Sequence, residues 1–395
     1  MQHLDVNDTA APDAVREILS AFVRRTGLEP AAAVPRRYLW TDAFAVGTLL
    51  ELHRTAGDRE SLEWAVRLVD QVHETLGRHR PDDSRSGWIS GLDDDQGRLH
   101  PTSGGLRIGK RLPERGPQEP FDERLEWERD GQYFHYLTKW MHALARLARA
   151  VEEERYLRWA IELARAAHAG FSYSPPGATG KRLVWKASID LTRPLVPSMG
   201  AHDPLDGLLT FRALRDDALR LGWSAADVGL DRAIGELRSM CAGRGWATAD
   251  PLGVGGLLGD AYRLALLSRT DDRDAALLPA LVDGAAAGLA ALASGGSLCG
   301  PAEARLAFRE LGLAIGLHAV PRLAGLVERE SPQAAHLREL RRPLEVLLPF
   351  VPLAANLEAF WSDPEHQRVE SWQGHLDIND VTLATSRMPG GLLGT

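Results

Sequence analysis

The chain has 395 residues, of which 44% are hydrophobic and 25% charged, and its formal net charge is -8. This composition is typical of a soluble globular protein with a full core, and the length allows two or three domains or one large helical one. Because the arginines are interleaved with Asp and Glu along the predicted helices, the charge pattern argues against a nucleic-acid partner.

No membrane span or disulfide framework is predicted. The first residues lack a basic stretch followed by an apolar run, and no run of about 18 uninterrupted apolar residues occurs. Cys241 and Cys299 do not have the spacing of a zinc site. We therefore expect a cytoplasmic protein with no membrane partner, no cofactor and no metal, for which a homodimer is a candidate assembly.

Apolar residues at helical spacing predict three helices near the start of the chain. They cover residues 13–25, the stretch from the 35–42 loop to Ala56, and residues 60–80. The last two form a hairpin that repeats, because residues 52–65 can be laid on residues 147–160 with Trp64 on Trp159, an offset of 159 − 64 = 95. Self-similar helical pairs are typical of a repeat architecture.

Further helical pairs follow along the chain. They are 204–220 with 225–241, 251–268 with 273–293, 302–318 with 333–347, and 353–361 with 377–385. About twelve helices without alternating strands predict an all-α fold, the six-hairpin (α/α)6 toroid, as one domain over residues 1–395. An open solenoid is the less favoured alternative, because its repeats have periods of about 20 to 50 residues.

Two long insertions separate the predicted hairpins. Residues 81–129 and 172–201 are too long for simple connections, and such loops in compact domains usually serve as lids or binding loops. We expect both at the rim of the active site, where Trp88 and Trp185 would lie.

Asp42 and Asp130 each precede or begin a predicted helix. A carboxylate in that place is either an N-cap or, when it faces a pocket, a general acid or base. After Asp130, a polar stripe of Gln132, His135, Lys139 and His142 has the spacing of one helix face. The stripe is either a solvated surface or part of the site, with Lys139 and His142 the more structural members.

The densest polar cluster is His202, Asp203 and Asp206. Pro204 in the first turn makes Asp203 a natural N-cap, which leaves His202 to face the rim. A metal site is weakly supported, because no second ligand has the HExxH spacing.

Residues 370–380 close the chain with a second mixture of aromatic and polar groups. They either complete the barrel or deliver His375 and Asp377 to the site. Indole faces suit the apolar face of a sugar ring, although tryptophan at a helix end is also ordinary packing. The candidate stacking surfaces are Tyr38, Trp40, Trp88, Trp185 and Trp372.

Three parts of the sequence resemble the six-hairpin glycosidase superfamily. They are the run Tyr38-Leu39-Trp40-Thr41-Asp42-Ala43-Phe44, the turn Thr55-Ala56-Gly57-Asp58, and Gly87-Trp88 with Asp93-Asp94-Asp95. Within it they look most like the N-acylglucosamine 2-epimerase and mannose isomerase group, whose histidine-rich helix start is similar to Phe134-His135-Tyr136-Leu137. The resemblance implies a saccharide substrate, with His202 and His375 as acid and base.

Three functions remain open. Slightly favoured is a hydrolase that uses paired carboxylates from Asp42, Asp130 and Asp203, as inverting glycosidases do. The alternative is a sugar 2-epimerase or aldose-ketose isomerase that uses His202 and His375. The third is a non-sugar toroid, either terpenoid-processing, as Asp93-Asp94-Asp95 faintly suggests, or non-catalytic.

Overall fold

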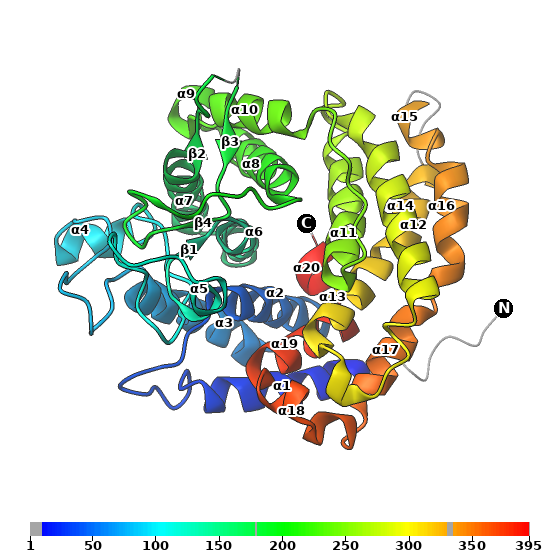
Figure 1. Ribbon diagram of the computed structural model, residues 1–395, viewed down its shortest axis with the longest axis horizontal. Helices are drawn as coiled ribbons and strands as arrows, with labels where there is room; N and C mark the ends of the chain where they lie inside the picture. Colours follow the sequence, from blue (N-terminus) through cyan, green and yellow to red (C-terminus); the bar gives the residue numbers. More distant parts are fainter. Residues whose placement is uncertain (1–9, 178–179, 330–334, 395) are drawn as a thin grey trace. The chain divides into compact units, whose positions relative to one another are not determined.

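The structure is a computed structural model, and it describes residues 10–177, 180–329 and 335–394 (Figure 1). The residues form two compact units. Unit 1 comprises Met1–Phe22, Arg54–Gly57 and Gly243–Thr395, and unit 2 comprises Val23–His53 and Asp58–Ala242. Whether the chain is one domain stays a prediction.

Unit 2 is built from helical hairpins joined by long connections. Its helices are α2 (Leu39–Ala56, whose last turn belongs to unit 1), α3 (Arg59–Leu76), α4 (Asp94–Leu99), α5 (Glu123–Glu128), α6 (Phe134–Val151), α7 (Glu154–Phe171), α8 (Asp203–Arg220), α9 (Ala225–Val228) and α10 (Asp231–Cys241). Helix α6 packs against α3, α7 and α8, and α8 packs against α10. The hairpins therefore share one helical core.

The predicted 95-residue repeat is confirmed by the helix bounds. Helices α2 and α6 begin 134 − 39 = 95 residues apart and end 151 − 56 = 95 apart. Helices α3 and α7 begin 154 − 59 = 95 residues apart and end 171 − 76 = 95 apart. The two hairpins are therefore equivalent structural units, and the first residues of α2 and α6 occupy equivalent positions in them.

Five short strands lie in unit 2, which the sequence did not predict. They are β1 (Gln132–Tyr133), β2 (Ser172–Tyr173), β3 (Arg182–Leu183), β4 (Lys186–Ala187) and β5 (Pro194–Val196). They form an antiparallel sheet of order β1-β4-β5 and an antiparallel pair β2-β3. Strands of two or three residues carry too little alternation to be recognised in a sequence. Their effect is local, because β1 joins the start of α6 to the 172–201 insertion.

Unit 1 holds most of α1 (Ala10–Arg25) and the C-terminal helices. They are α11 (Pro251–Leu267), α12 (Leu278–Gly295), α13 (Ala307–Leu317), α14 (Ala319–Arg329), α15 (Ala335–Arg338), α16 (Arg341–Leu347), α17 (Leu353–Ser362), α18 (Glu370–Gln373), α19 (Leu376–Arg387) and α20 (Gly390–Leu393), with 3-10 turns η1 (Ala275–Leu277), η2 (Ala302–Ala304), η3 (Leu348–Phe350) and η4 (His366–Arg368). Helix α11 packs against α12, α13 and α14 (Figure 1). Gly255 and Gly312 permit this close approach, because a Cβ on Gly255 would lie 2.1 Å from the Gly312 carbonyl oxygen.

Two predicted pairs are wrong in detail. The partner that follows α13 is α14, whereas residues 333–347 contain α15 and α16, and the first of those residues lie outside the described part of the chain. The stretch 225–241 is two helices, because Gly229 ends α9 in a left-handed conformation with φ 61°.

Three segments of unit 1 have the length and apolar composition of a membrane span. They are Ala275–Gly295, Ala307–Arg329 and Arg341–Ser362, and 50%, 72% and 28% of their most apolar windows are buried. The sequence search for uninterrupted apolar runs missed these segments, because a few polar residues interrupt each of them. The absence of a membrane partner stays a prediction.

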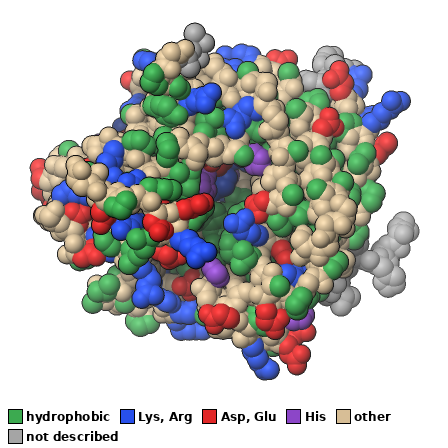
Figure 2. Space-filling model, viewed as in Figure 1, with side chains coloured by type: hydrophobic (Ala, Val, Ile, Leu, Met, Phe, Trp, Pro, Cys, Tyr) green, Lys and Arg blue, Asp and Glu red, His purple; other side chains and the backbone are tan. Residues whose placement is uncertain are grey.

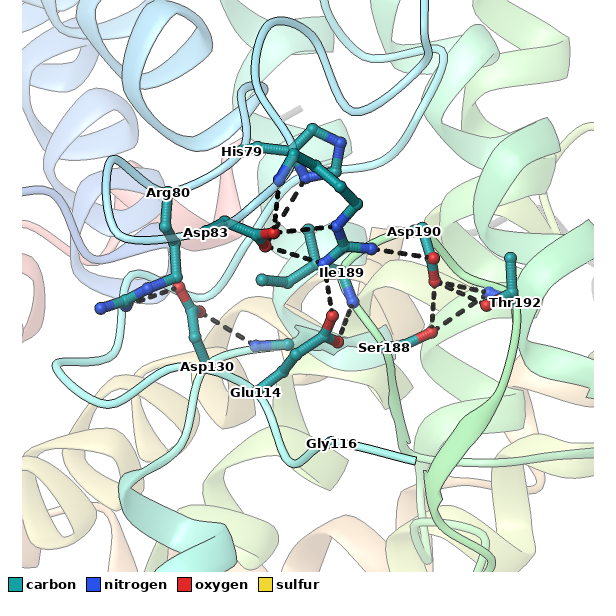
Figure 3. Close-up of polar contacts among 12 residues, drawn as sticks. His79, Arg80, Asp83, Glu114, Gly116, Asp130, Ser188, Ile189, Asp190 and Thr192 are labelled. Atoms are coloured by element: carbon teal, nitrogen blue, oxygen red, sulfur yellow. Dashed lines mark hydrogen bonds and ion pairs between the residues drawn. The ribbon is translucent and has the colours of Figure 1, made fainter. Parts of the chain in front are cut away.

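The 81–129 insertion is tied down by charged contacts within unit 2. Arg85 forms ion pairs with Asp83 (2.8 Å), Glu114 (2.6 Å) and Asp190 (2.9 Å), and Glu114 also accepts from the Ile189 amide at 2.7 Å (Figure 3). The hydrogen bond from Arg85 holds the pKa of Asp83 at about 2. On the face drawn in Figure 2, charged side chains of both signs gather over this insertion, at the left of the view. Its role as a lid stays a prediction.

Candidate active site

Asp42 is held in a structural role at the start of α2. Its side chain is 1% exposed, and Oδ1 lies 3.2 Å from the Arg37 guanidinium, itself fully buried. Oδ2 accepts a hydrogen bond at 3.0 Å from the backbone amide of Tyr38, the residue before the helix. The carboxylate therefore fixes the helix start, and the neighbouring Trp40 is 4% exposed and stacks on Phe44 at 3.9 Å.

Asp130 is still more completely satisfied. It is 0% exposed, and its Oδ2 accepts from Arg107 at 2.6 Å and from Arg80 at 3.4 Å. Its Oδ1 accepts from the amides of Gly109 and Gly131, both at 3.0 Å. Four donors around one carboxylate leave it no lone pair directed at a substrate.

Gln132 also has a structural environment. It lies in β1, before α6 begins, so the predicted single helical stripe is wrong at this residue. Its amide oxygen accepts from the Leu106 amide at 2.8 Å, and its nitrogen donates to the carbonyls of Gly104 and Ile189. The buried side chain therefore joins the 81–129 insertion to the 172–201 insertion.

The starts of α6 and α8 bring a histidine and a carboxylate together. His135 Nδ1 lies 3.7 Å from Asp203 Oδ1, with the two side chains 35% and 9% exposed. The imidazole is about two-thirds buried, and its other ring nitrogen, Nε2, forms no hydrogen bond with the described residues. Because the carboxylate attracts the proton to Nδ1, Nε2 presents a lone pair.

Burial lowers the pKa of His135 to about 4, while Asp206 acts in the opposite direction. Asp206 accepts hydrogen bonds from Thr138 at 2.6 Å and from the Lys139 ammonium at 2.9 Å. Lys139 adds to the lowering of the His135 pKa. The imidazole is therefore neutral at pH 7 and can accept a proton, with two carboxylates nearby to stabilise the resulting charge.

The helix start of α8 differs from the prediction. His202 is the N-cap residue, although its side chain forms no capping hydrogen bond, and Asp203 is the first residue of the helix. Asp203 is thus not the N-cap, because the chain enters the helix one residue earlier, with Pro204 in its first turn. His202 is half-buried beside it.

Aromatic rings surround His135. The hydroxyls of Tyr38 and Tyr136 are 2.8 Å apart and join the starts of α2 and α6. The Tyr133 ring stacks on His135 at 5.6 Å and contacts Trp185 at 5.0 Å. We call Tyr38, Tyr133, His135, Tyr136, Trp185 and Asp203 the tyrosine–histidine cluster.

The hydroxyls of Tyr38 and Tyr133 stay protonated at neutral pH. Burial raises the pKa of Tyr38 to about 12, and it also raises the pKa of Tyr133. The Tyr133 hydroxyl is buried and has no hydrogen-bond partner among the described residues. The Lys110 ammonium lies 5.5 Å from the centre of the Tyr38 ring, and burial lowers its pKa. A second ammonium, that of Lys186, lies 5.5 Å from the centre of the Tyr133 ring. The cluster therefore offers hydroxyl donors beside two lysines.

The structure thus brings together five predicted residues: Tyr38, His135, Trp185, Asp203 and Asp206. Trp88 lies elsewhere in unit 2, where it is 2% exposed under the Arg78 guanidinium. In unit 1, Trp372 packs in a core with Trp361, His375 is exposed against Phe308, and Asp377 lies in the first turn of α19. The roles of these unit 1 residues stay predictions.

The sequence did not single out Tyr133, Tyr136, Lys110 or Trp127 as site residues. Tyr133 and Tyr136 flank His135, so a histidine between two tyrosines at a helix start was the available signal. Trp127 is 49% exposed and contacts Trp185 at 5.0 Å, and Lys110 is half-buried. Among the residues that the structure describes, no group of three or more His, Cys, Asp or Glu is placed to hold a metal ion.

No protein-family model matches this chain, and no curated protein matches it. Solved structures do. The GH76A alpha-1,6-mannanase from Salegentibacter sp. HEL1_6 has a TM-score of 0.51 at 11% identity, covering 96% of this chain and 99% of the mannanase chain. The cellobiose 2-epimerase from Spirochaeta thermophila DSM 6192 gives 0.47 at 13% identity over 96% and 98%, and a D-mannose isomerase gives 0.45 at 11% over 88% of each chain.

The likeness to the mannanase extends over almost the whole of both chains and shows the fold. The predicted class, a mostly helical (α/α)6 six-hairpin toroid, is confirmed.

Proposed function

We propose that this protein is a carbohydrate-active enzyme that moves a proton at the carbon beside the carbonyl of a reducing sugar. The observation that carries the proposal is the His135–Asp203 pair: a neutral, partly exposed imidazole whose Nδ1 faces a carboxylate 3.7 Å away and whose Nε2 has no partner among the described residues. A general base needs this combination of access and an available lone pair.

The chemistry needs no cofactor. His135 Nε2 takes the proton from the carbon next to the carbonyl; the electron pair of that C–H bond becomes a carbon–carbon double bond, and the π pair of the carbonyl moves onto its oxygen to give an enediolate. The imidazolium is stabilised by Asp203 and by Asp206. Transfer of the hydroxyl proton from the neighbouring oxygen to the former carbonyl oxygen, with return of the proton from His135 to the former carbonyl carbon, gives the aldose-ketose isomer. Return of a proton to the opposite face of the carbon that lost it gives the 2-epimer and needs a second proton donor, for which His202 is our candidate.

Partly exposed aromatic rings support a saccharide substrate. The indoles of Trp185 and Trp127 offer large rigid faces next to the cluster. The Tyr38–Tyr136 hydroxyl pair and the Lys110 ammonium supply donors for hydroxyl or enediolate oxygens. The mannanase with this fold acts on a saccharide, as its name states, which agrees with the proposal.

Hydrolysis by paired carboxylates becomes the second candidate, although the sequence slightly favoured it. A glycosidase needs one carboxyl to donate a proton and another to activate water or attack. Asp42 and Asp130 are buried among arginine and amide donors, so neither is directed at a substrate. Of the three carboxylates that the sequence favoured, only Asp203 lies beside the partly exposed His135. The structure therefore offers one suitable carboxylate where a glycosidase needs two.

The test is proton exchange in heavy water. A panel of reducing sugars is incubated with the protein, and deuterium at the carbon beside the carbonyl is followed by NMR. We expect exchange with the wild-type chain and a loss of about 10²–10⁴-fold in His135→Gln. The control is His53→Gln, a half-buried histidine of unit 2 that contacts the Asp58 carbonyl instead of a carboxylate.

A second assay, with aryl glycosides as substrates, tests for hydrolysis. Release of aglycone without any exchange would reject proton transfer and restore hydrolysis. Exchange that survives His135→Gln would reject His135 as the base.

A further inference from the structure

A second pocket opens in unit 2, away from the tyrosine–histidine cluster's residues. Its volume is about 520 Å³, and its walls come from α3, α4 and α7 with their connections. Small-molecule sites commonly measure roughly 300–1,000 Å³. Two of its walls are the indoles of Trp88 and Trp159, which are 2% and 7% exposed and therefore rigidly packed. The pocket is large enough for one or two sugar rings.

His73 places a buried polar group at this pocket. The residue is 3% exposed, and its Nε2 accepts a hydrogen bond from Trp140 Nε1 at 3.1 Å. Burial lowers its pKa to about 3, so the ring is neutral and its single proton is on Nδ1. Nδ1 has no hydrogen-bond partner among the described residues and is not an enclosed atom, so this N–H donor is open to the pocket that His73 lines.

Two charged side chains at the pocket have no opposite charge bound to them. Asp70 on α3 forms no hydrogen bond or ion pair among the described residues. Arg158 on α7 likewise has no ion pair there, and its guanidinium lies 5.0 Å from the centre of the Trp223 ring. Arg155, one turn earlier, is paired with Glu153 at 2.7 Å. The pocket thus presents an acceptor from one helix and a donor from the other.

We propose that this pocket binds a neutral pyranose, as a saccharide site separate from the tyrosine–histidine cluster. Sugar hydroxyls both donate and accept, so one ring can bond the Asp70 carboxylate, the Arg158 guanidinium and the His73 N–H together. Its C–H face suits the indole walls. A simple anion fits less well because it would meet the Asp70 carboxylate, and a simple cation would meet Arg155 and Arg158.

The proposal does not depend on the enzymatic proposal. A methyl pyranoside has no free carbonyl, so it cannot undergo proton exchange beside a carbonyl at His135. Its binding to the second pocket can therefore succeed or fail whatever the outcome of the exchange assay.

The experiment is isothermal titration of the full chain with methyl glucopyranoside and methyl mannopyranoside. We expect one-site binding of at least one of them in the wild-type chain and in His135→Gln. Asp70→Asn and Arg158→Gln each remove one charged hydrogen-bond partner and should weaken that binding about tenfold or more. The matched control is Glu63→Gln, an α3 carboxylate that is 65% exposed and lies outside the pocket.

Two results would overturn the proposal. One is that neither pyranoside binds, and binding of benzoate or of phenylalanine that is lost in Arg158→Gln would then assign the pocket to an aromatic carboxylate instead. The other is binding that persists unchanged in both Asp70→Asn and Arg158→Gln.

Discussion

Asp130 and Asp203 lie near the starts of neighbouring helices, α6 and α8, yet their surroundings differ. Asp130 is enclosed by two arginines and two backbone amides, and every donor comes from a different residue. Asp203 faces a neutral histidine at 3.7 Å, and that histidine keeps an open nitrogen. The carboxylate of Asp130, whose donors are all within the protein, stabilises the fold. The carboxylate of Asp203, which lies beside a neutral histidine, can support proton transfer.

The largest effect is expected at Asp203. Replacing it in Asp203→Asn removes the charge that orients the His135 tautomer and stabilises the imidazolium, so the exchange rate should fall about 10²–10⁴-fold. The control is Asp231→Asn, which is also the first residue of its helix but is 59% exposed and paired with Arg215. Exchange equal to that of the wild-type chain in Asp203→Asn would remove the distinction between the two carboxylates.

Asp130→Asn should act on stability instead. It leaves Arg107 and Arg80 without their shared counter-charge, and breaking a buried ion pair costs about 3–5 kcal/mol. Urea unfolding followed by circular dichroism measures the change, with the exposed Asp95→Asn as a control that should stay within about 0.5 kcal/mol. A stable Asp130→Asn variant with no exchange activity would instead make Asp130 an acid or base.

The buried histidine His73 should make the stability of the fold depend on pH. The pKa of His73 is lowered from 6.5 to about 3, so only the unfolded chain takes up this proton between those values. Stability from this residue is therefore complete above pH 6.5 and is lost as the pH falls toward 3, by about 1.4 kcal/mol per pH unit. In His73→Gln the free energy of unfolding should therefore fall less steeply between pH 6 and pH 5, by about 1.4 kcal/mol per pH unit. Identical slopes would show that His73 is protonated in the folded chain.

The sequence was most informative about the hairpins and least about the partners of their polar residues. Trp64 and Trp159 revealed an offset that the helix bounds repeat residue for residue. The arginines that satisfy Asp130 come from positions 23 and 50 residues away. Arg107 lies in the 81–129 insertion, which has no helical period to place it, and Arg80 was expected at the end of a helix. Without them, Asp130 and Asp203 looked alike.

The aromatic residues show the same limit. Tyr38 was predicted as an aromatic surface for a sugar, but its hydrogen-bond partner Tyr136 is 98 residues away and is brought there by the packing of the hairpins. Tyr133 was not singled out, because a tyrosine before a helix is ordinary until its hydroxyl is seen to lack a partner. Spacing along one helix finds residues on one face, but contacts between helix starts depend on the packed fold.

The smallest effects compare two tyrosines within the cluster. Tyr38→Phe removes one hydrogen bond, to Tyr136, and should lower the free energy of unfolding by about 1 kcal/mol. Tyr136→Phe removes the same bond, so the double variant should lose clearly less than the sum of the two single losses.

Tyr133→Phe should behave differently, because it deletes a buried hydroxyl that has no partner among the described residues. Removing an unsatisfied polar group recovers its desolvation cost, so the free energy of unfolding should stay level or rise, by about 1 kcal/mol at most. Urea titration of the four variants beside the wild-type chain measures all these differences. A loss in Tyr133→Phe as large as that in Tyr38→Phe would mean that the Tyr133 hydroxyl is bonded in solution, and its place in the cluster as an open donor would then be wrong.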